Sequence, residues 1–303
     1  MIGFVFPGQG TVRVGMGGWL RKEAAAAPVW TQADETGDDL TRLCSRGPLA
    51  RLVDTRNAQP AVTACNLAAL AVLRDRGVAP DVVAGHSVGE LSALCAAGVL
   101  ELGETLRLVA DRSALMAQLP GRGVMSSVLG LPVARVEELA GEASRPGEPL
   151  VVGLDNAEDQ VVVSGAPEAL ERFTAAATDA RSITALKVSH AFHSPLMAGA
   201  VDAWAETVRA APLRPPRIPV VPNATGEPTT DLRVITDALI DQLVARVQWT
   251  RTMTAFSAMS TVDRCVEVGD SKALTGMFRT VGVRCVSMSD PGALRRLIPG
   301  GAR

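Results

Sequence analysis

Cysteine is scarce in this sequence, and no two cysteines stand at a spacing typical of a metal site or a disulfide framework. The five cysteines are an odd number, lie far apart and include no Cys-x-x-Cys pair. This pattern excludes a small disulfide-rich secreted protein and a structural zinc site, so we expect no bound metal and a reducing, cytoplasmic location. The cysteines are Cys44, Cys65, Cys95, Cys265 and Cys285.

Long apolar runs and an excess of positive charge are missing as well. The apolar runs are short and interrupted by charged residues, which predicts no membrane span. The first ten residues, MIGFVFPGQG, lack the basic start and long apolar stretch of a signal peptide, and they predict a strand that enters a loop. A formal net charge of -2 gives no basic surplus for binding nucleic acid.

What the sequence does have is enough apolar material for one large α/β domain. It has 303 residues, and 47% of them are hydrophobic, so it can bury a substantial core. Short apolar runs bounded by Gly or Pro predict strands, and a 3.6-residue period predicts helices. The expected strands outside the middle of the chain are 2–6, 81–84, 218–221 and 264–268, and the expected helices there include 61–76, 91–97, 104–118, 195–211 and 271–280.

The middle of the chain, residues 123–190, has a different order of elements. Strand and helix patterns alternate there as β-α-β-β-α-β, the order of a ferredoxin-like unit. We therefore expect a small subdomain at 123–190, inserted into an α/β core made of residues 1–122 and 191–303. The expected elements of the insert are strands at 124–130, 150–154, 160–163 and 182–188 and helices at 133–143 and 167–177.

Residues 85–89 (GHSVG) match the pattern G-x-S-x-G between a predicted strand and a predicted helix. That context is typical of a nucleophile elbow, a tight turn that presents a serine at the start of a helix. Ser87 would be the nucleophile, and the backbone N–H of Val88, the next residue, would stabilise an oxyanion. The pattern also occurs by chance in glycine-rich chains, so it needs a matching base.

Histidines are few, which narrows the search for that base. The chain has three, and His86 is a poor partner for Ser87 because adjacent side chains point apart. His190 and His193 follow a predicted strand, and we favour His193. The carboxylate of a conventional catalytic triad is harder to assign, since the candidates Asp155 and Asp159 fall in the predicted insert. A backbone carbonyl can also orient a neutral imidazole, and both alternatives stay open here.

With these segments placed, the chain resembles the malonyl-CoA:acyl carrier protein transacylases and the related acyltransferases of polyketide synthases, including free-standing ones. The resemblance runs from end to end and joins many short motifs in one order. It implies a hydrolase-like parallel-sheet core with an inserted ferredoxin-like subdomain. The matching segments are FPGQG at 6–10, GMG at 15–17, GHSVGE at 85–90, Arg112 with Met116, Asn156 with VSG at 163–165, HAFHS at 190–194, NATG at 223–226, QL at 242–243 with VQW at 247–249, and EVG at 267–269.

The resemblance also implies a role for each matched residue. The acyl group would pass from a coenzyme A thioester to Ser87 and then to the phosphopantetheine thiol of an acyl carrier protein, in a ping-pong reaction without a permanently bound cofactor. His193 would be the base. Arg112 would pair with the free carboxylate of a malonyl group through charge-assisted hydrogen bonds. The other implied roles are Gln9 and Val88 as backbone oxyanion donors, Gln242 as the residue that orients His193, and His86, Met116, Phe192 and Asn156 as substrate-pocket residues.

Two motifs depart from the family pattern, and one position bears on substrate choice. Thr11-Val12 stands where Ser-Gln is usual, and Asp270 stands where Pro is common, so we expect altered loop packing near the pocket mouth. Phe192 should crowd a substituent on the malonyl α-carbon. Plain malonyl is therefore the first choice, with ethylmalonyl, hydroxymalonyl and aminomalonyl left open.

Other functions fit parts of the same sequence. A hydrolase that clears acyl groups from carrier proteins would use the same serine, although related hydrolases tend to lack the arginine at 112. A catalytically silent docking module would need none of these residues. Exposed arginines could dock an acidic carrier protein, but ordinary solvated surface accounts for them equally well. These arginines are Arg42, Arg46, Arg51 and Arg56.

Overall fold

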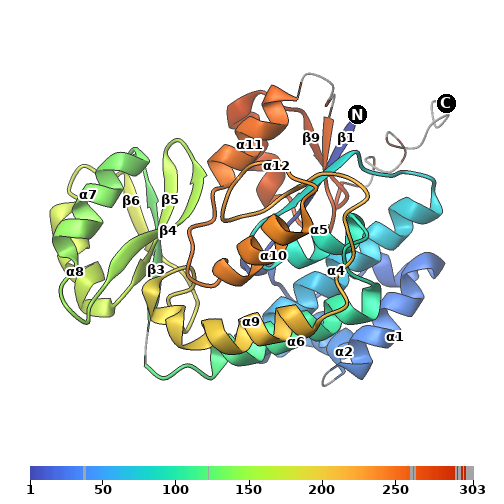
Figure 1. Cartoon of the computed structure of the whole chain (residues 1–303), viewed down its shortest axis with the longest axis horizontal. Helices are drawn as coiled ribbons and strands as arrows, with labels where there is room; N and C mark the ends of the chain where they lie inside the picture. The colour runs from blue at the N-terminus through green and yellow to red at the C-terminus, as the bar shows by residue number, and fades with distance from the viewer. Residues whose placement is uncertain are drawn as a thin grey trace.

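The computed structural model describes residues 1–36, 39–121, 123–259, 262, 264–290, 292, 295 and 297. Arg122 and Arg303, which end the two predicted core segments, lie outside the described residues. Figure 1 shows a larger unit that contains both the first strand and the last helices, and a smaller unit beside it built around strands β3 to β6. This arrangement confirms the predicted fold class.

The larger unit is organised around a parallel sheet of five strands in the order β7-β2-β1-β8-β9. Its centre is β1 (Ile2–Phe6), whose sequence IGFVF is almost wholly buried. A parallel sheet is covered on both faces, and this explains why β1 is a continuous apolar run without alternation. The remaining strands are β2 (Val82–Gly85), β7 (Val220–Val221), β8 (Arg264–Glu267) and β9 (Cys285–Ser287).

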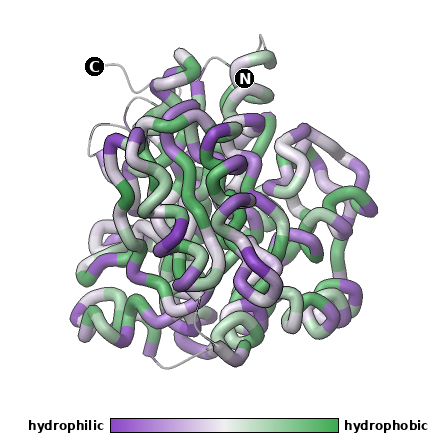
Figure 2. Tube along the Cα trace, turned by 90° about the vertical axis from the view of Figure 1, so that its left-hand side faces the viewer, coloured by the Kyte–Doolittle hydropathy of each residue, from purple (hydrophilic) through white to green (hydrophobic). Residues whose placement is uncertain are grey.

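Helices cover this sheet. The most enclosed is α5 (Gly89–Ala96), which packs on β1 and β2 and has seven buried residues. This helix is buried on every side, polar residues Glu90 and Ser92 included, whereas the helices outside it are amphipathic. In Figure 2 green and purple segments alternate along the outer helices, as expected of amphipathic helices. The other α-helices of this unit are α1 (Ala27–Glu35), α2 (Leu40–Arg46), α3 (Leu49–Leu52), α4 (Thr55–Asp75), α6 (Leu102–Ala117), α9 (Val201–Ala210), α10 (Leu232–Asp241), α11 (Trp249–Ala258) and α12 (Ala273–Phe278).

The smaller unit is an antiparallel sheet in the order β4-β5-β3-β6, with α7 and α8 packed on it. This order and the β-α-β-β-α-β sequence are those of a ferredoxin-like fold. Residues on either side of the unit meet, because a Cβ on Gly123 would lie 2.3 Å from the backbone nitrogen of Ala191. Its elements are β3 (Val124–Leu129), α7 (Val133–Ala143), β4 (Leu150–Ala157), β5 (Gln160–Gly165), α8 (Pro167–Ala176) and β6 (Ser182–Ala185).

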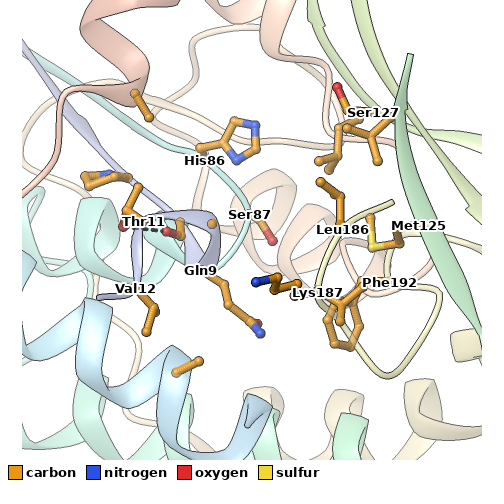
Figure 3. A pocket seen from close by; sticks show the side chains of 18 of the residues that line it. Gln9, Thr11, Val12, His86, Ser87, Met125, Ser127, Leu186, Lys187 and Phe192 are labelled. Atoms are coloured by element: carbon orange, nitrogen blue, oxygen red, sulfur yellow. Dashed lines mark hydrogen bonds between the residues drawn. The ribbon is translucent and has the colours of Figure 1, made fainter. Parts of the chain in front are cut away.

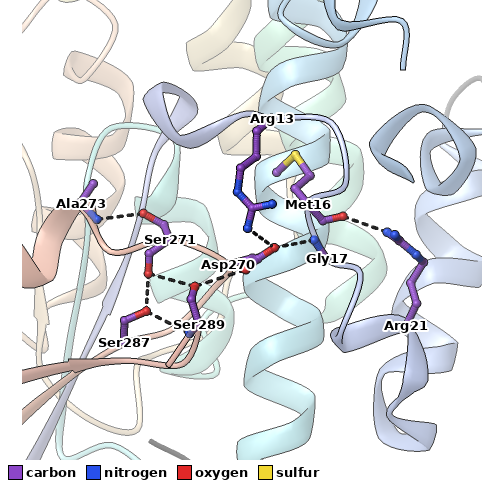
Figure 4. A network of polar contacts seen from close by, with 9 residues as sticks. All are labelled: Arg13, Met16, Gly17, Arg21, Asp270, Ser271, Ala273, Ser287 and Ser289. Atoms are coloured by element: carbon purple, nitrogen blue, oxygen red, sulfur yellow. Dashed lines mark hydrogen bonds and ion pairs between the residues drawn. The ribbon is translucent and has the colours of Figure 1, made fainter. Parts of the chain in front are cut away.

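Asp270, one of the two departures from the family pattern, ties the first long loop to the segment after β8. Its Oδ2 accepts the backbone N–H of Gly17 at 2.8 Å and pairs with Arg13 at 2.7 Å. Its Oδ1 accepts the hydroxyl of Ser289 at 3.2 Å, and Figure 4 shows these contacts converging on one carboxylate. The side chain is 5% exposed. Asp270 thereby fixes the far end of the loop that leaves β1.

Within the described ranges, no helix combines the length and the apolar character needed to cross a membrane. In the same ranges, no group of three or more His, Cys, Asp or Glu side chains is placed to hold a metal ion.

Replacing Asp270 with Ala should lower the free energy of unfolding by about 1–3 kcal/mol, because the N–H of Gly17 would lose its buried acceptor. Asp270→Asn should lose less, since its amide oxygen can still accept that hydrogen bond. Urea unfolding of both variants measures the difference. Equal losses in the two variants would show that the ion pair with Arg13 matters and the backbone contact does not.

Candidate active site

A cavity of about 510 Å³ opens between the elbow, the loop after β1 and the smaller unit. Ser87 and His193 both line it, and residues of the smaller sheet form its opposite wall. Figure 3 shows Gln9 and Ser87 facing Leu186, Lys187 and Phe192 across this space. The residues that line it include Gln9, Gln59, His86, Ser87, Met116, Asn156, Phe192 and His193.

The elbow that carries Ser87 depends on the absence of side chains at its two glycines. A Cβ on Gly85 would lie 2.0 Å from the carbonyl carbon of Gly89, and one on Gly89 would lie 2.2 Å from the carbonyl oxygen of Phe6. Ser87 itself has φ 53°, a strained left-handed conformation for a residue with a side chain. The backbones of β2 and α5 therefore pack closely on either side of the turn, which keeps the Ser87 hydroxyl in the cavity.

The base predicted for Ser87 is in contact with it. His193 Nε2 lies 2.7 Å from Ser87 Oγ, and the imidazole is buried. On its other side, Nδ1 lies 2.8 Å from the carbonyl oxygen of Gln242 and 3.1 Å from that of Ala245. Carbonyl oxygens can only accept, so we assign the proton to Nδ1, which leaves Nε2 free to take the serine proton.

The two acids considered as triad members lie elsewhere. Asp155 accepts a hydrogen bond from Thr250 at 2.7 Å, and Asp159 pairs with Arg181 at 3.0 Å. The backbone carbonyl alternative is the one that the structure shows. His190 is not the partner of Ser87 either, because its Nε2 lies 3.3 Å from the carbonyl oxygen of Leu119.

The electrostatics of the site favour an uncharged imidazole. Burial, followed by the positive charge of Arg112, lowers the pKa of His193 to about 3. Burial likewise lowers the pKa of His86, whose Nε2 lies 2.7 Å from the Oδ1 of Asn156. A neutral His193 can act as a general base across the neutral pH range.

Arg112 lies beneath the cavity wall. Its side chain is 1% exposed, its Nη1 donates to Gln59 Oε1 at 2.6 Å, and its Nη2 donates to Gln242 Oε1 at 2.8 Å. Burial lowers the pKa of its guanidinium to about 10, so it stays charged at neutral pH. Gln59 lines the cavity, and Arg112 is one side chain further in.

The predicted oxyanion donors and pocket residues surround Ser87. Gln9 begins the short helix η1 (Gln9–Thr11), and Val88 is the N-cap of α5. Amides at helix starts have no partner inside the helix and are suited to bind an anion. Met116, Phe192, His86 and Asn156 all line the cavity, as do Thr11 and Val12.

Sequence reasoning gave no role to three residues that hold this site together. Asn223 accepts the backbone N–H of Ser87 at 2.7 Å and donates to the carbonyl of Gly85 at 2.6 Å, so it braces the elbow. Glu90 accepts from Gln242 Nε2 at 2.6 Å. Asn223 and Glu90 lie in recognised motifs, but Gln59 stands in an ordinary helical stretch that carries no signal.

The comparison that decides the family is with the acyl transferase domain, whose family model matches residues 3–269. The chain belongs to this family. Near-full-length relatives of this acyltransferase include a malonyl CoA-acyl carrier protein transacylase of Synechocystis, 37% identical over 91% of this chain and 92% of the relative.

Solved structures agree with that assignment. A malonyl-CoA:acyl carrier protein transacylase from Xanthomonas oryzae superimposes with a TM-score of 0.92 at 31% identity, covering 98% of this chain and 97% of the other. A malonyl-transacylase in complex with a type II polyketide synthase acyl-carrier protein gives a TM-score of 0.93 at 31% identity, with 98% of each chain covered. The acyltransferase therefore shares its whole architecture with these proteins.

Because the pKa of His193 is lowered to about 3, the acyltransferase should keep its base active well below the usual histidine range. We expect the rate of serine acylation not to fall as the pH drops through 6.5. It should fall only at a lower pH, as the lowered pKa of His193 is approached. Stopped-flow acylation between pH 4.5 and 7.5, with circular dichroism at each pH to monitor folding, measures this. An acid limb at pH 6.5 in folded protein would contradict it.

Proposed function

We propose that this acyltransferase moves a malonyl group from coenzyme A to the phosphopantetheine thiol of an acyl carrier protein, through an ester on Ser87. The observation that carries the proposal is the 2.7 Å contact between Ser87 Oγ and a neutral, carbonyl-held His193, with the buried guanidinium of Arg112 nearby. The near-full-length similarity to malonyl transacylases supports the choice of acyl group.

The first half-reaction follows from the site. As Ser87 Oγ attacks the thioester carbonyl, its proton passes to His193 Nε2, and the negative charge on the former carbonyl oxygen is stabilised by the amides of Gln9 and Val88. The tetrahedral intermediate collapses to the serine ester, and the leaving sulfur takes the proton from His193. The second half-reaction repeats these steps in reverse, with the carrier's thiol as the nucleophile.

Arg112 explains why the enzyme should prefer an acyl group that carries a carboxylate. Its guanidinium donates hydrogen bonds to the neutral amide oxygens of Gln59 and Gln242. A malonyl carboxylate that displaces the Gln59 amide would replace a neutral acceptor with a charged one, and charge-assisted bidentate pairs are the stronger interaction. Acetyl and longer neutral groups offer nothing comparable, which favours malonyl over them.

Phe192 supports malonyl without a substituent. The ring lies in the cavity wall and is 6% exposed, so it limits the space beside the acyl α-carbon. The corresponding biological role is to supply malonyl groups for fatty acid or polyketide synthesis, and one structural neighbour is a malonyl-transacylase in complex with a type II polyketide synthase acyl-carrier protein. We also propose a cytoplasmic location. The proposed division of the chain is a core of residues 1–122 and 191–303 and a subdomain of residues 123–190.

Ser87→Ala provides the direct test of the acyl-enzyme. After incubation of wild-type protein with malonyl-CoA, intact-protein mass spectrometry should show one added malonyl group, and Ser87→Ala should show none. Adding holo-carrier protein should remove the adduct and load the carrier, whereas a hydrolase would release free malonate. An adduct that persists in Ser87→Ala would place the nucleophile elsewhere.

Arg112→Ala tests the carboxylate clamp. Loss of a charge-assisted pair should lower kcat/KM for malonyl-CoA roughly 10- to 100-fold, while loading from acetyl-CoA falls much less. Arg107→Ala is the matched control, because Arg107 lies on the same helix but is 46% exposed and pairs with Glu104 and Asp111. Equal losses for malonyl and acetyl in Arg112→Ala would show that the arginine serves the fold and not the carboxylate.

A further inference from the structure

Glu90 is a buried carboxylate that the proposed reaction does not use. It lies in the first turn of α5, with 0% of the residue exposed. Its Oε2 accepts from Gln242 Nε2 at 2.6 Å and from the backbone N–H of Asn223 at 3.1 Å. Within the described chain, its other oxygen, Oε1, has no hydrogen-bond partner. A buried ionised carboxylate with one unsatisfied oxygen is costly and needs a compensating charge.

That charge is Arg112, and Gln242 joins the two. The amide oxygen of Gln242 accepts from Arg112 Nη2 at 2.8 Å, and its amide nitrogen donates to Glu90 at 2.6 Å. The direct partners of Arg112 on both Nη atoms are neutral amide oxygens. The guanidinium and the carboxylate are therefore one amide group apart in a dry interior, where opposite charges interact strongly.

We propose that Glu90 is the resident counter-charge of Arg112, and that it takes up a proton when a substrate carboxylate binds to Arg112. This inference rests on the carboxylate-clamp role of Arg112 in the proposed function. Before binding, one buried cation faces one buried anion. After binding, the cation of Arg112 would face two anions, the carboxylate of Glu90 and that of the substrate. One of the two must be neutralised, because otherwise they would repel each other.

The geometry identifies where the proton goes. Oε2 already accepts two hydrogen bonds, so Oε1 is the oxygen that becomes protonated. The proton comes from solvent as the substrate binds, and it returns to solvent when the malonyl group leaves on the carrier protein. No bond other than this O–H forms or breaks.

The other groups described around Glu90 do not take up that proton at neutral pH, so Glu90 is its acceptor. Burial raises the pKa of Glu90 to about 7, against the opposing effects of the hydrogen bonds from Asn223 and Gln242 and of the charge of Arg112. His193 and His86, the two imidazoles of the site, are neutral because burial lowers their pKa values. Asn223 and Gln242 do not titrate. A second anion on Arg112 raises the pKa of Glu90 further, so binding and protonation favour each other.

The first experiment compares the pH dependence of loading for a charged and a neutral acyl group. In wild-type protein kcat/KM for malonyl-CoA should fall above about pH 7, by up to tenfold per pH unit, while the acetyl-CoA profile shows no such limb. In Glu90→Gln the malonyl profile should become flat, and its value at pH 8.5 should exceed that of wild type. A malonyl limb that persists in folded Glu90→Gln, or an equal limb with acetyl-CoA, would overturn the proposal.

A second measurement does not depend on the stability of that variant. Ser87→Ala keeps the site but cannot be acylated, so binding of malonyl-CoA to it can be followed by calorimetry in buffers of different ionisation enthalpy. At pH 7.5 we expect net uptake of up to one proton, and none with acetyl-CoA. Malonyl-CoA binding without proton uptake would refute the role of Glu90.

These experiments distinguish a failure of the Glu90 proposal from a failure of the proposed function. If Arg112→Ala loses malonyl selectivity while proton uptake is absent, the clamp stands and the counter-charge does not. If Arg112→Ala retains malonyl selectivity, the clamp itself fails, whatever Glu90 does.

Discussion

The hydrogen bond from His193 to the backbone carbonyl of Gln242 is the constraint on which the site depends. It fixes the tautomer of the base, and so decides that Nε2 faces Ser87. The side chain of the same glutamine donates to the carbonyl of Ser87 and contacts both Arg112 and Glu90. One residue thus holds the base by its main chain and the charged groups by its amide, so that nucleophile, base and clamp keep a common geometry.

Much of this could be predicted from the sequence because the signals are local. The strand–turn–helix around Ser87 follows from two glycines that no other residue could replace, and the scarcity of histidine singled out His193. The β-α-β-β-α-β order predicted the smaller sheet with boundaries close to those observed, although β6 ends at Ala185 and not at 188. The first three α-helices and strand β9 were not predicted, because they are short and owe their order to packing on α4 and β8.

The rest of the site depends on contacts between residues far apart in the chain. Arg112 looks like any polar residue of an amphipathic helix until α6 packs on α4 and brings it to Gln59. The residues alone left open the choice between a carboxylate and a carbonyl behind His193, and it was the family resemblance that indicated Gln242, which is 49 residues away. Such pairings carry no periodicity or spacing, so they cannot be derived from one sequence without a family resemblance.

The carbonyl behind His193 has a consequence for the potential inside the cavity. A triad aspartate would add a full negative charge to the wall that receives the acyl group, and a substrate that is itself an anion would have to enter against that field. The peptide oxygens of Gln242 and Ala245 orient the imidazole with dipoles alone. Around Ser87 the positive potential comes from Arg112 and the amide donors, and no triad carboxylate adds to the negative charge of Glu90. The site is therefore suited to a negatively charged acyl group before any contact with that group is made.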